Sequence, residues 1–270
     1  MAYRAIATDL DGTLLRRDNT VSARTRAAID AAEDAGLLFI VATGRPPRWI
    51  HPVIEQIGHR GLVVCANGAS VFDPAENRLM VRNDLDLDVA AGLVDDILGS
   101  YPHAVLGFEQ GMTFSADTSI AASNFGLFES WKLQGMQVGP IRSFLTEPVT
   151  KLIIRLPDDT PPGAARDVQA LVGDRALVTH STTESFLELS HPDVHKASTV
   201  ERLLEDAGIA AAETVAFGDM PNDLELIRWA GLGVAVANAH PRLLAEADEV
   251  TASNEDDGIA LVIERILADQ

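Results

Sequence analysis

The sequence predicts an α/β protein whose core is a doubly wound parallel sheet, with a smaller α+β domain inserted into the chain. Short apolar segments alternate with helix-like segments near both ends of the 270 residues. Several of those apolar segments end directly in Asp, Thr or Asn. Between them, shorter segments alternate in polarity and are broken by Gly and Pro, a pattern typical of antiparallel strands.

The first third of the chain shows the strand-helix alternation. An apolar strand over residues 3–7 is followed by a helix that Ser22 caps and Gly36 ends. The next strand, residues 37–42 (LLFIVA), has no polar alternation, which predicts a parallel sheet covered on both faces. Pro46 suits the first turn of a new helix. That helix runs to residue 57, and the strand 62–66 follows.

We expect the core to comprise residues 1–83 and 191–270, and the inserted domain residues 84–190. The inserted domain is expected to contain a helix over 86–98, a hairpin over 104–115, a weaker helical stretch over 118–133, a strand over 149–156, a helix after Pro162, and strands over 176–180 and 186–189. The core pattern then resumes with a helix over 198–207, a strand over 214–218, a helix from Pro221 to 230, a strand over 232–236, and helices around Arg242 and over 259–268.

Composition narrows the range of partners. Lys and Arg number 21 against 40 Asp and Glu, so the net charge is −19, the wrong sign for a surface that binds nucleic acid. No apolar run approaches the roughly 20 residues that span a bilayer, and Asp9 lies where a signal peptide needs its apolar region. We therefore expect no membrane partner and a cytoplasmic location. The single cysteine, Cys65, lies in an apolar run and is expected to be a buried thiol.

Asp9 and Asp11 are the first residues with predicted chemistry. They follow the opening strand two positions apart, so they point the same way. Two carboxylates about 4 Å apart repel by about 4 kcal/mol at an effective dielectric constant of 20. Such a pair is tolerated with a bound cation or a shared proton, and this predicts metal chemistry.

Further polar groups share the same edge of the predicted sheet. Thr43 and Asp219 each follow an apolar strand, Asn222 and Asp223 come shortly after, and Lys196 precedes the strand 214–218. Carboxylates suit Mg²⁺, while a hydroxyl, an ammonium and an amide can hold a phosphate. An aspartate can then attack phosphorus through an aspartyl-phosphate intermediate.

These motifs resemble those of the haloacid-dehalogenase-like phosphatases, in particular the Cof-type branch with an α/β cap. Residues 9–13 (Asp-Leu-Asp-Gly-Thr) match the first motif of that family, and Thr43 in Ala-Thr-Gly-Arg matches the second. Lys196 matches the third motif, and residues 218–223 (Gly-Asp-Met-Pro-Asn-Asp) match the fourth. Residues 67–69 and 238–239 also resemble segments of this branch. The resemblance covers the whole chain, with the cap between the second and third motifs.

The resemblance implies a role for each matched residue. Asp9 would be the nucleophile and a Mg²⁺ ligand, and Asp11 the general acid and then base, binding the metal through its backbone carbonyl. Asp219 would be a further ligand, supported by Asp223 from the second shell. Thr43, Gly44, Lys196 and Asn222 would hold the transferring phosphate. In two places the chain departs from the branch: His195 precedes the lysine and Ala197 follows it, and both departures bear on how the lysine loop is held.

The implied function is a Mg²⁺-dependent phosphatase that acts on a small phosphorylated metabolite, with a sugar phosphate as the default substrate. A phosphosugar mutase is an alternative within the same family. A phospho-aspartate receiver module is an alternative from another class, although there the acid pair and the phosphorylated aspartate lie on different strands. The motifs specify neither the particular metabolite nor the oligomeric state.

Overall fold

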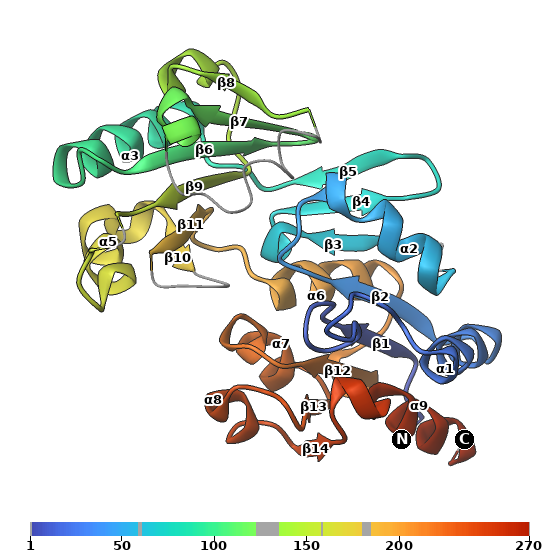
Figure 1. Cartoon of the computed structure of the whole chain (residues 1–270). Coiled ribbons are helices and arrows are strands. Elements are labelled where there is room, and N and C mark those ends of the chain that lie inside the picture. Colours follow the sequence, from blue (N-terminus) through green and yellow to red (C-terminus); the bar gives the residue numbers. More distant parts are fainter. Residues whose placement is uncertain (1, 59–60, 123–134, 158, 180–184, 270) are drawn as a thin grey trace. The chain divides into compact units, whose positions relative to one another are not determined.

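The structure is a computed structural model that describes residues 2–58, 61–122, 135–157, 159–179 and 185–269. The chain forms two compact units (Figure 1). The core unit comprises Met1–Arg45, Trp49–Met80 and His195–Gln270, and the inserted unit comprises Pro46–Arg48 and Val81–Val194. Each unit has its own cluster of buried apolar side chains.

The core unit is built on an eight-stranded sheet, and this confirms the predicted fold class. The strands from β14 to β3 run parallel, and β4 turns back antiparallel to β3. Central strands such as β1 and β12 are buried along their whole length. In sheet order the strands are β14 (Glu249–Thr251), β13 (Leu232–Val236), β12 (Thr214–Gly218), β1 (Ala5–Thr8), β2 (Leu38–Ala42), β3 (Val63–Cys65), β4 (Ser70–Asp73) and β5 (Arg78–Arg82).

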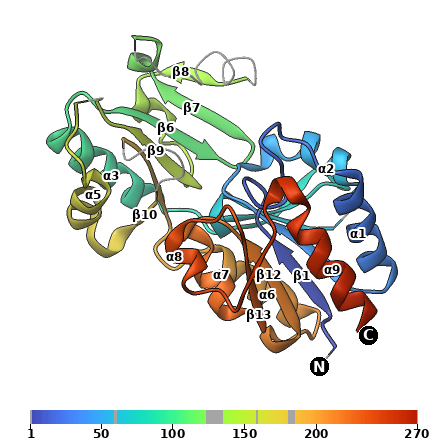
Figure 2. The same cartoon turned by 60° about the horizontal axis from the view of Figure 1, so that its bottom comes forward.

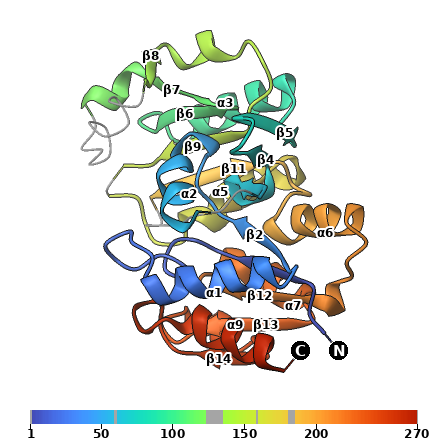
Figure 3. The ribbon, with the colours of Figure 1, turned by 90° about the vertical axis from the view of Figure 1, so that its right-hand side faces the viewer.

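Helices cover both faces of this sheet. Helices α1 (Ala23–Asp34) and α9 (Gly258–Ala268) lie side by side on one face, and α6 (Lys196–Asp206) and α7 (Leu224–Trp229) lie on the other (Figures 2 and 3). Ser22 caps α1 as predicted, because its side-chain oxygen accepts a hydrogen bond from the Thr25 amide at 2.9 Å. The remaining helices of the unit are α2 (His51–Ile57), α8 (Pro241–Leu244) and the 3₁₀ turns Pro47–Trp49, Ala66–Gly68, Ala211–Glu213, Pro221–Asp223 and Asn254–Asp256.

In its described residues the inserted unit is a six-stranded, mostly antiparallel sheet, and helices α3 and α5 pack against each other on it. Alternate apolar residues of the central strands join the buried cluster of α3 and α5, so one face of the sheet is covered by these helices. Its elements are α3 (Leu87–Ser100), β6 (Val105–Gln110), β7 (Thr113–Asp117), β8 (Gln137–Gly139), β9 (Lys151–Arg155), α5 (Ala164–Val172), β10 (Leu177–Thr179), β11 (Phe186–Ser190) and the 3₁₀ turns Thr118–Ala122, Ile141–Phe144 and Gly173–Arg175.

Several elements differ from the expectation. Strands β4, β5, β8 and β14 were not predicted, because they are only three to five residues long and show little periodicity. Of the helical stretch expected over residues 118–133, the 3₁₀ turn Thr118–Ala122 is described, and 123–133 lie outside the described residues. Helix α6 begins at Lys196 rather than at residue 198, because His195 caps it. Among the described residues, no helix is both long and apolar enough to cross a bilayer.

Candidate active site

The predicted catalytic residues of the core unit lie at the carboxyl edge of its parallel strands. Strand β1 lies between β12 and β2, with Thr8 in register with Phe217 on one side and Val41 on the other. Asp9 therefore leaves the sheet beside Asp219 and Thr43, which follow β12 and β2. Ligands bind at this edge in open α/β sheets, because the loops there come from neighbouring strands.

Three buried carboxylates form the centre of the site. Oxygen atoms of Asp9, Asp219 and Asp223 all lie within 4.8 Å of one another. Gly12 makes room for this arrangement, because a Cβ atom at its position would lie 2.3 Å from Oδ2 of Asp219. Thr13 donates a hydrogen bond from its hydroxyl to the other Asp219 oxygen at 3.1 Å. The loop after β1 thus holds an acid that comes from β12.

Lys196 reaches the same centre from the start of α6. Its ammonium lies 2.5 Å from Oδ1 of Asp9 and 2.7 Å from Oδ1 of Asp223, and only 1% of its surface is exposed. Burial alone would lower the pKa of Lys196, but the carboxylates of Asp223 and Asp9 outweigh burial and raise it. The side chain therefore stays an ammonium at neutral pH.

The acids carry more negative charge than the lysine offsets. Burial raises the pKa of Asp9 well above its usual value, although Lys196 opposes this, and Asp223 and Asp219 add to the rise. Burial, then the charge of Asp223, raises the pKa of Asp219 to about 7. Three ionised carboxylates and one ammonium leave a formal charge of −2. An all-oxygen donor set with that charge fits a hard divalent cation such as Mg²⁺.

Asp223 differs from the other two acids because both of its oxygens already accept hydrogen bonds. Oδ1 faces Lys196, and Oδ2 accepts from the backbone amides of Asp219 and Met220, each at 3.1 Å. It thereby fixes the lysine and the loop that carries Asp219. These bonds suit the supporting position that the resemblance implies.

The side chain of Asp11 lies apart from the three buried acids. Arg45 donates two hydrogen bonds to it, from Nε at 2.8 Å and from Nη2 at 2.5 Å, one to each carboxylate oxygen. About half of the Asp11 side chain is exposed to solvent. Asp9 and Asp11 look nearly equivalent in the sequence, but their side chains have different surroundings in the structure.

Among the residues that the resemblance assigns to phosphate binding, Thr43, Gly44 and Asn222 lie on the loops after β2 and β12. Thr43 is buried, and its hydroxyl accepts a hydrogen bond from the Arg45 amide at 3.1 Å. The side-chain amide of Asn222 donates to Oδ1 of Asn67 at 3.0 Å. A Cβ atom on Gly44 would lie 3.1 Å from that same oxygen. The Asn67 backbone amide donates to the Thr43 carbonyl at 2.9 Å, so Asn67 links the loops after β2, β3 and β12.

His195 and Ala197, the two departures from the family pattern, have structural roles at the start of α6. The His195 ring accepts a hydrogen bond from the Ser198 amide at 3.2 Å, while the Ser198 hydroxyl accepts from the His195 amide at 3.2 Å. This reciprocal cap extends the helix to Lys196, so the lysine leaves from its first turn. Ala197 is buried beside it.

Arg45 and Asn67 are site residues that lie in segments matched by the resemblance but were given no role from the sequence. Arg45 follows the matched Thr43-Gly44 pair, and its place just after a predicted strand of the same sheet was a signal that it could reach Asp11. Asn67 adopts a left-handed backbone conformation with φ of +58° and precedes Gly68 at the end of β3. Asn tolerates that conformation better than most residues, which explains its presence at this sharp turn.

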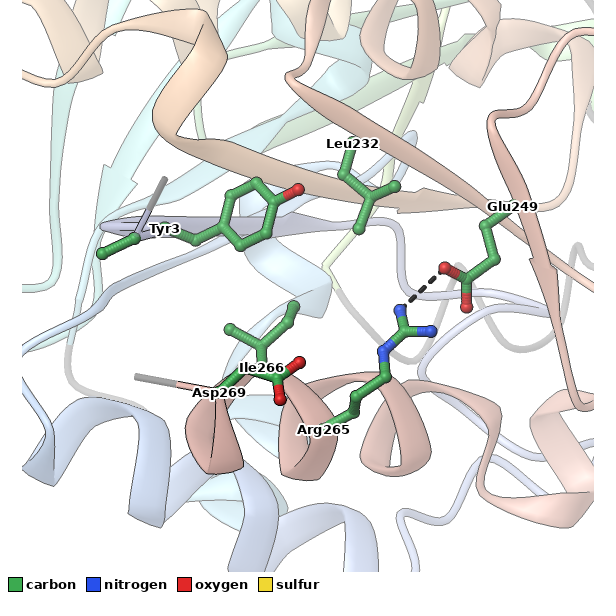
Figure 4. A pocket seen from close by; sticks show the side chains of 7 residues that line it. Tyr3, Leu232, Glu249, Arg265, Ile266 and Asp269 are labelled. Carbon is green, nitrogen blue, oxygen red and sulfur yellow. Dashed lines mark hydrogen bonds and ion pairs between the residues drawn. The ribbon is translucent and has the colours of Figure 1, made fainter.

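A pocket also lies at the amino-terminal ends of β13 and β14, away from the carboxyl edge that carries the acids. Its lining combines apolar side chains with the ion pair between Arg265 and Glu249, whose atoms are 2.7 Å apart (Figure 4). No residue of the acid centre lines it. The residues that line it are Ala2, Tyr3, Leu232, Glu249, Arg265, Ile266 and Asp269.

The fold and the site define a class of protein: an α/β protein that holds a buried lysine beside three buried acids at the carboxyl edge of its parallel strands. The model of the family described as haloacid dehalogenase-like hydrolase matches residues 6–263, so the chain belongs to this family. Its named relatives are phosphatases, and the chain is a phosphatase of the Cof-type branch.

Three relatives illustrate the similarity. The chain is 31% identical over 261 residues to the 5-amino-6-(5-phospho-D-ribitylamino)uracil phosphatase YitU of Bacillus subtilis, covering 94% of each protein. It is 31% identical to a phosphoglycolate phosphatase of Methanothermobacter thermautotrophicus, covering 98% of this chain and 99% of the relative. A crystal structure of a haloacid dehalogenase-like hydrolase from Bacteroides thetaiotaomicron superposes with a TM-score of 0.79 at 27% identity, covering 98% and 99% of the two chains.

Proposed function

We propose that this protein is a Mg²⁺-dependent phosphomonoester hydrolase that forms an aspartyl phosphate on Asp9. The observation that carries the proposal is the pairing of Asp9 with the buried ammonium of Lys196, 2.5 Å away, beside two further acids. A nucleophilic carboxylate needs its repulsion with an anionic substrate offset, and this arrangement supplies positive charge at the attacking atom.

In the first half of the reaction, a carboxylate oxygen of Asp9 attacks phosphorus while the bond from phosphorus to the leaving oxygen breaks. Asp11 gives its proton to that oxygen, which leaves as an alcohol. Lys196, Thr43 and Asn222 hold the phosphoryl oxygens as the negative charge moves across the group. The products of this half are the alcohol, the aspartyl phosphate and ionised Asp11.

In the second half, water attacks the phosphorus of the aspartyl phosphate. Asp11 takes a proton from the water as the bond between phosphorus and Asp9 breaks, which restores the carboxylate of Asp9 and the protonated Asp11. Inorganic phosphate then leaves. The same side chain therefore acts as acid and then base, so each turnover returns the site to its starting state.

A bound Mg²⁺ would be held by side-chain oxygens of Asp9 and Asp219 and the backbone carbonyl of Asp11, with Asp223 in support. When bound, it would neutralise the acids and the phosphoryl oxygens and so lower the barrier to attack. The formal charge of −2 and the all-oxygen donor set support this assignment.

We also propose that the inserted unit is a cap that sets substrate specificity. The sheet face opposite α3 and α5 carries charged side chains among apolar ones such as Ile153. Lys151 on β9 pairs with Glu188 on β11 at 2.8 Å, and Glu109 on β6 pairs with Arg48. Arg48 also lies over the ring of Phe114, 5.1 Å from its centre.

Such a face suits a ligand rich in hydroxyl groups. A hydroxyl can donate a hydrogen bond to a carboxylate and accept one from an ammonium or guanidinium group, so alternating charges can bind several hydroxyls without net charge. Burial raises the pKa of Glu109, and the charge of Arg48 opposes the rise, so the ionised form of Glu109 depends on a neighbouring cation or hydrogen-bond donor. These features support a sugar phosphate or related polyol phosphate as the substrate.

A small phosphorylated metabolite also supports a cytoplasmic location, because its charge keeps it from crossing a membrane. A phosphosugar mutase remains the alternative within the family. Family membership argues against the phospho-aspartate receiver alternative.

A turnover screen tests the proposal. The purified protein is incubated with a panel of sugar, polyol and other small phosphate esters, with Mg²⁺ or with EDTA. We expect phosphate release from hydroxyl-rich esters in Mg²⁺ and none in EDTA. Transfer of the phosphate to another position of a hexose, with no phosphate released, would instead identify a mutase.

A further inference from the structure

We propose that Arg45 is a positioning residue that sets the orientation of the Asp11 carboxyl group. The proposal rests on the proposed function, because it assigns Arg45 to the group that moves the protons. The guanidinium bonds both oxygens of Asp11 in a fork, from Nε at 2.8 Å and from Nη2 at 2.5 Å. Arg forms such two-bond pairs with a fixed geometry that Lys cannot reproduce.

Arg45 is itself held at three points. Its amide donates to the Thr43 hydroxyl at 3.1 Å, and its carbonyl accepts from the Ala66 amide at 2.9 Å. Its Nη2 atom also donates to Oδ1 of Asn19 at 3.1 Å. The backbone of Arg45 is therefore tied to the loops after β2 and β3, and its side chain to the loop after β1. A guanidinium fixed in this way can hold its partner in one direction.

Asp11 needs such a partner more than the buried acids do. Asp9, Asp219 and Asp223 are enclosed by neighbouring atoms, whereas the Asp11 side chain is 52% exposed. An exposed carboxylate at a turn would otherwise sample several rotamers. Proton transfer requires the donor and acceptor atoms to stay within hydrogen-bond reach, so loss of one fixed orientation slows both proton steps.

The fork also explains how Asp11 can be held and still react. Both oxygens accept from Arg45 in the structure, so one bond must be given up when that oxygen handles a proton. The second hydrogen bond from Arg45 keeps the orientation of the Asp11 carboxyl group while the first is broken. Arg45 therefore acts through Asp11 and need not touch the reacting phosphorus.

Leaving-group dependence distinguishes this role from substrate binding. Alkyl phosphates need a proton on the departing oxygen, whereas p-nitrophenolate departs as a stable anion. We expect Arg45→Ala to slow formation of the phosphoenzyme from an alkyl phosphate by about a hundredfold. The burst of nitrophenolate from p-nitrophenyl phosphate should stay within about threefold of the parent rate, while the later steady state slows. Arg45→Lys should recover only part of the loss.

A double-mutant cycle with Asp11→Asn gives the decisive comparison. If Arg45 acts through Asp11, then Arg45→Ala should cost nothing further in the Asp11→Asn background. Arg24→Ala is the matched control, because Arg24 makes an equivalent two-bond pair with Glu264, at 2.9 and 2.6 Å, between helices α1 and α9 rather than at the carboxyl edge of the sheet. This control should keep the parent rates.

The outcomes separate this inference from the proposed function. Additive losses in the double variant, or equal losses with both leaving groups, would overturn the positioning role and identify Arg45 as a substrate-binding residue. A higher KM with unchanged kcat would do the same. If Asp11→Asn alone leaves turnover of alkyl phosphates unchanged, the proton role of Asp11 in the proposed function fails instead.

Discussion

The ammonium of Lys196 lies 2.5 Å from the carboxylate of Asp9, although the two residues are 187 positions apart in the chain. Their contact joins the first turn of α6 to the end of β1, and Asp223 accepts a second bond from the same ammonium. Because Lys196 is almost fully buried, this pair places a permanent positive charge beside the proposed nucleophile.

Replacement of this lysine should therefore cost rate. We expect Lys196→Met, measured at saturating Mg²⁺, to lower kcat by about 10²–10³-fold, because a fixed charge at the developing negative charge is lost. Leaving two buried acids without their partner should also destabilise the metal-free fold by about 3–5 kcal/mol. Steady-state kinetics and thermal melts with and without Mg²⁺ check both effects. A variant with the parent kcat would show that the lysine is only structural.

Gly12 should be needed for the position of Asp219. An added Cβ would lie 2.3 Å from Oδ2 of Asp219, so Gly12→Ala should displace that carboxylate and weaken Mg²⁺ binding at least about tenfold, a loss of about 1.4 kcal/mol. Activity measured against Mg²⁺ concentration gives the apparent affinity. Gly36→Ala is the matched control, because Gly36 has a similar φ of +86° and nothing within 4 Å of its added Cβ. Equal Mg²⁺ affinities in the two variants would contradict the assignment.

Stability without metal should depend on pH through Asp219. Its pKa is raised from 3.8 to about 7 in the fold, so the folded state binds this proton more tightly than the unfolded state. The resulting stability is fully present below about pH 4 and is lost as the pH rises through about 7, on the order of 4 kcal/mol in all. Thermal melts in EDTA from pH 4 to 8 test this. The slope should be smaller in Asp219→Asn and in the parent protein with Mg²⁺.

If the slope in EDTA is the same in the parent protein and in Asp219→Asn, then the burial of this carboxyl is not its source. Magnesium binding near pH 7 should also release protons, because the metal replaces the proton on Asp219. Calorimetry in buffers with different ionisation enthalpies measures that release.

The charged face of the inserted unit should govern substrate affinity. We expect the double variant Lys151→Met with Glu188→Gln to raise KM for sugar phosphates about tenfold, a loss of about 1.4 kcal/mol, and to leave KM for acetyl phosphate unchanged. Replacing both partners avoids an unpaired buried charge. Asp96→Asn, which breaks the exposed pair with Arg175, is the control and should change neither value. An equal rise for acetyl phosphate would argue against a role in specificity.

The sequence predicted the parallel core well because buried parallel strands are continuous apolar runs that end in the functional acids. Thr214–Gly218 with Asp219 directly after it is the clearest example. Short strands such as Glu249–Thr251 were missed, since three residues carry no readable period and their pairing is decided by β13. The predicted start of α6 was also wrong by two residues, because histidine is an uncommon N-cap residue.

The candidate site was predictable as a set of residues but not as a set of contacts. Asp9 and Asp11 share a strand end in the sequence, yet only tertiary structure shows that one faces Lys196 and the other Arg45. The hydrogen bond between Asn67 and Asn222, which are 155 positions apart, likewise cannot be predicted from local sequence patterns.

Rapid-mix kinetics with p-nitrophenyl phosphate, combined with mass spectrometry of acid-quenched protein, test the central claim most directly. Asp11→Asn should give a burst of nitrophenolate and then a slow steady state, because Asp9 can still be phosphorylated while hydrolysis of the intermediate is slowed. Asp9→Asn should give neither a burst nor turnover. In the parent protein and in Asp11→Asn, the added phosphoryl group should be found on Asp9. A burst from Asp9→Asn, or a phosphoryl group on Asp11, would contradict the account.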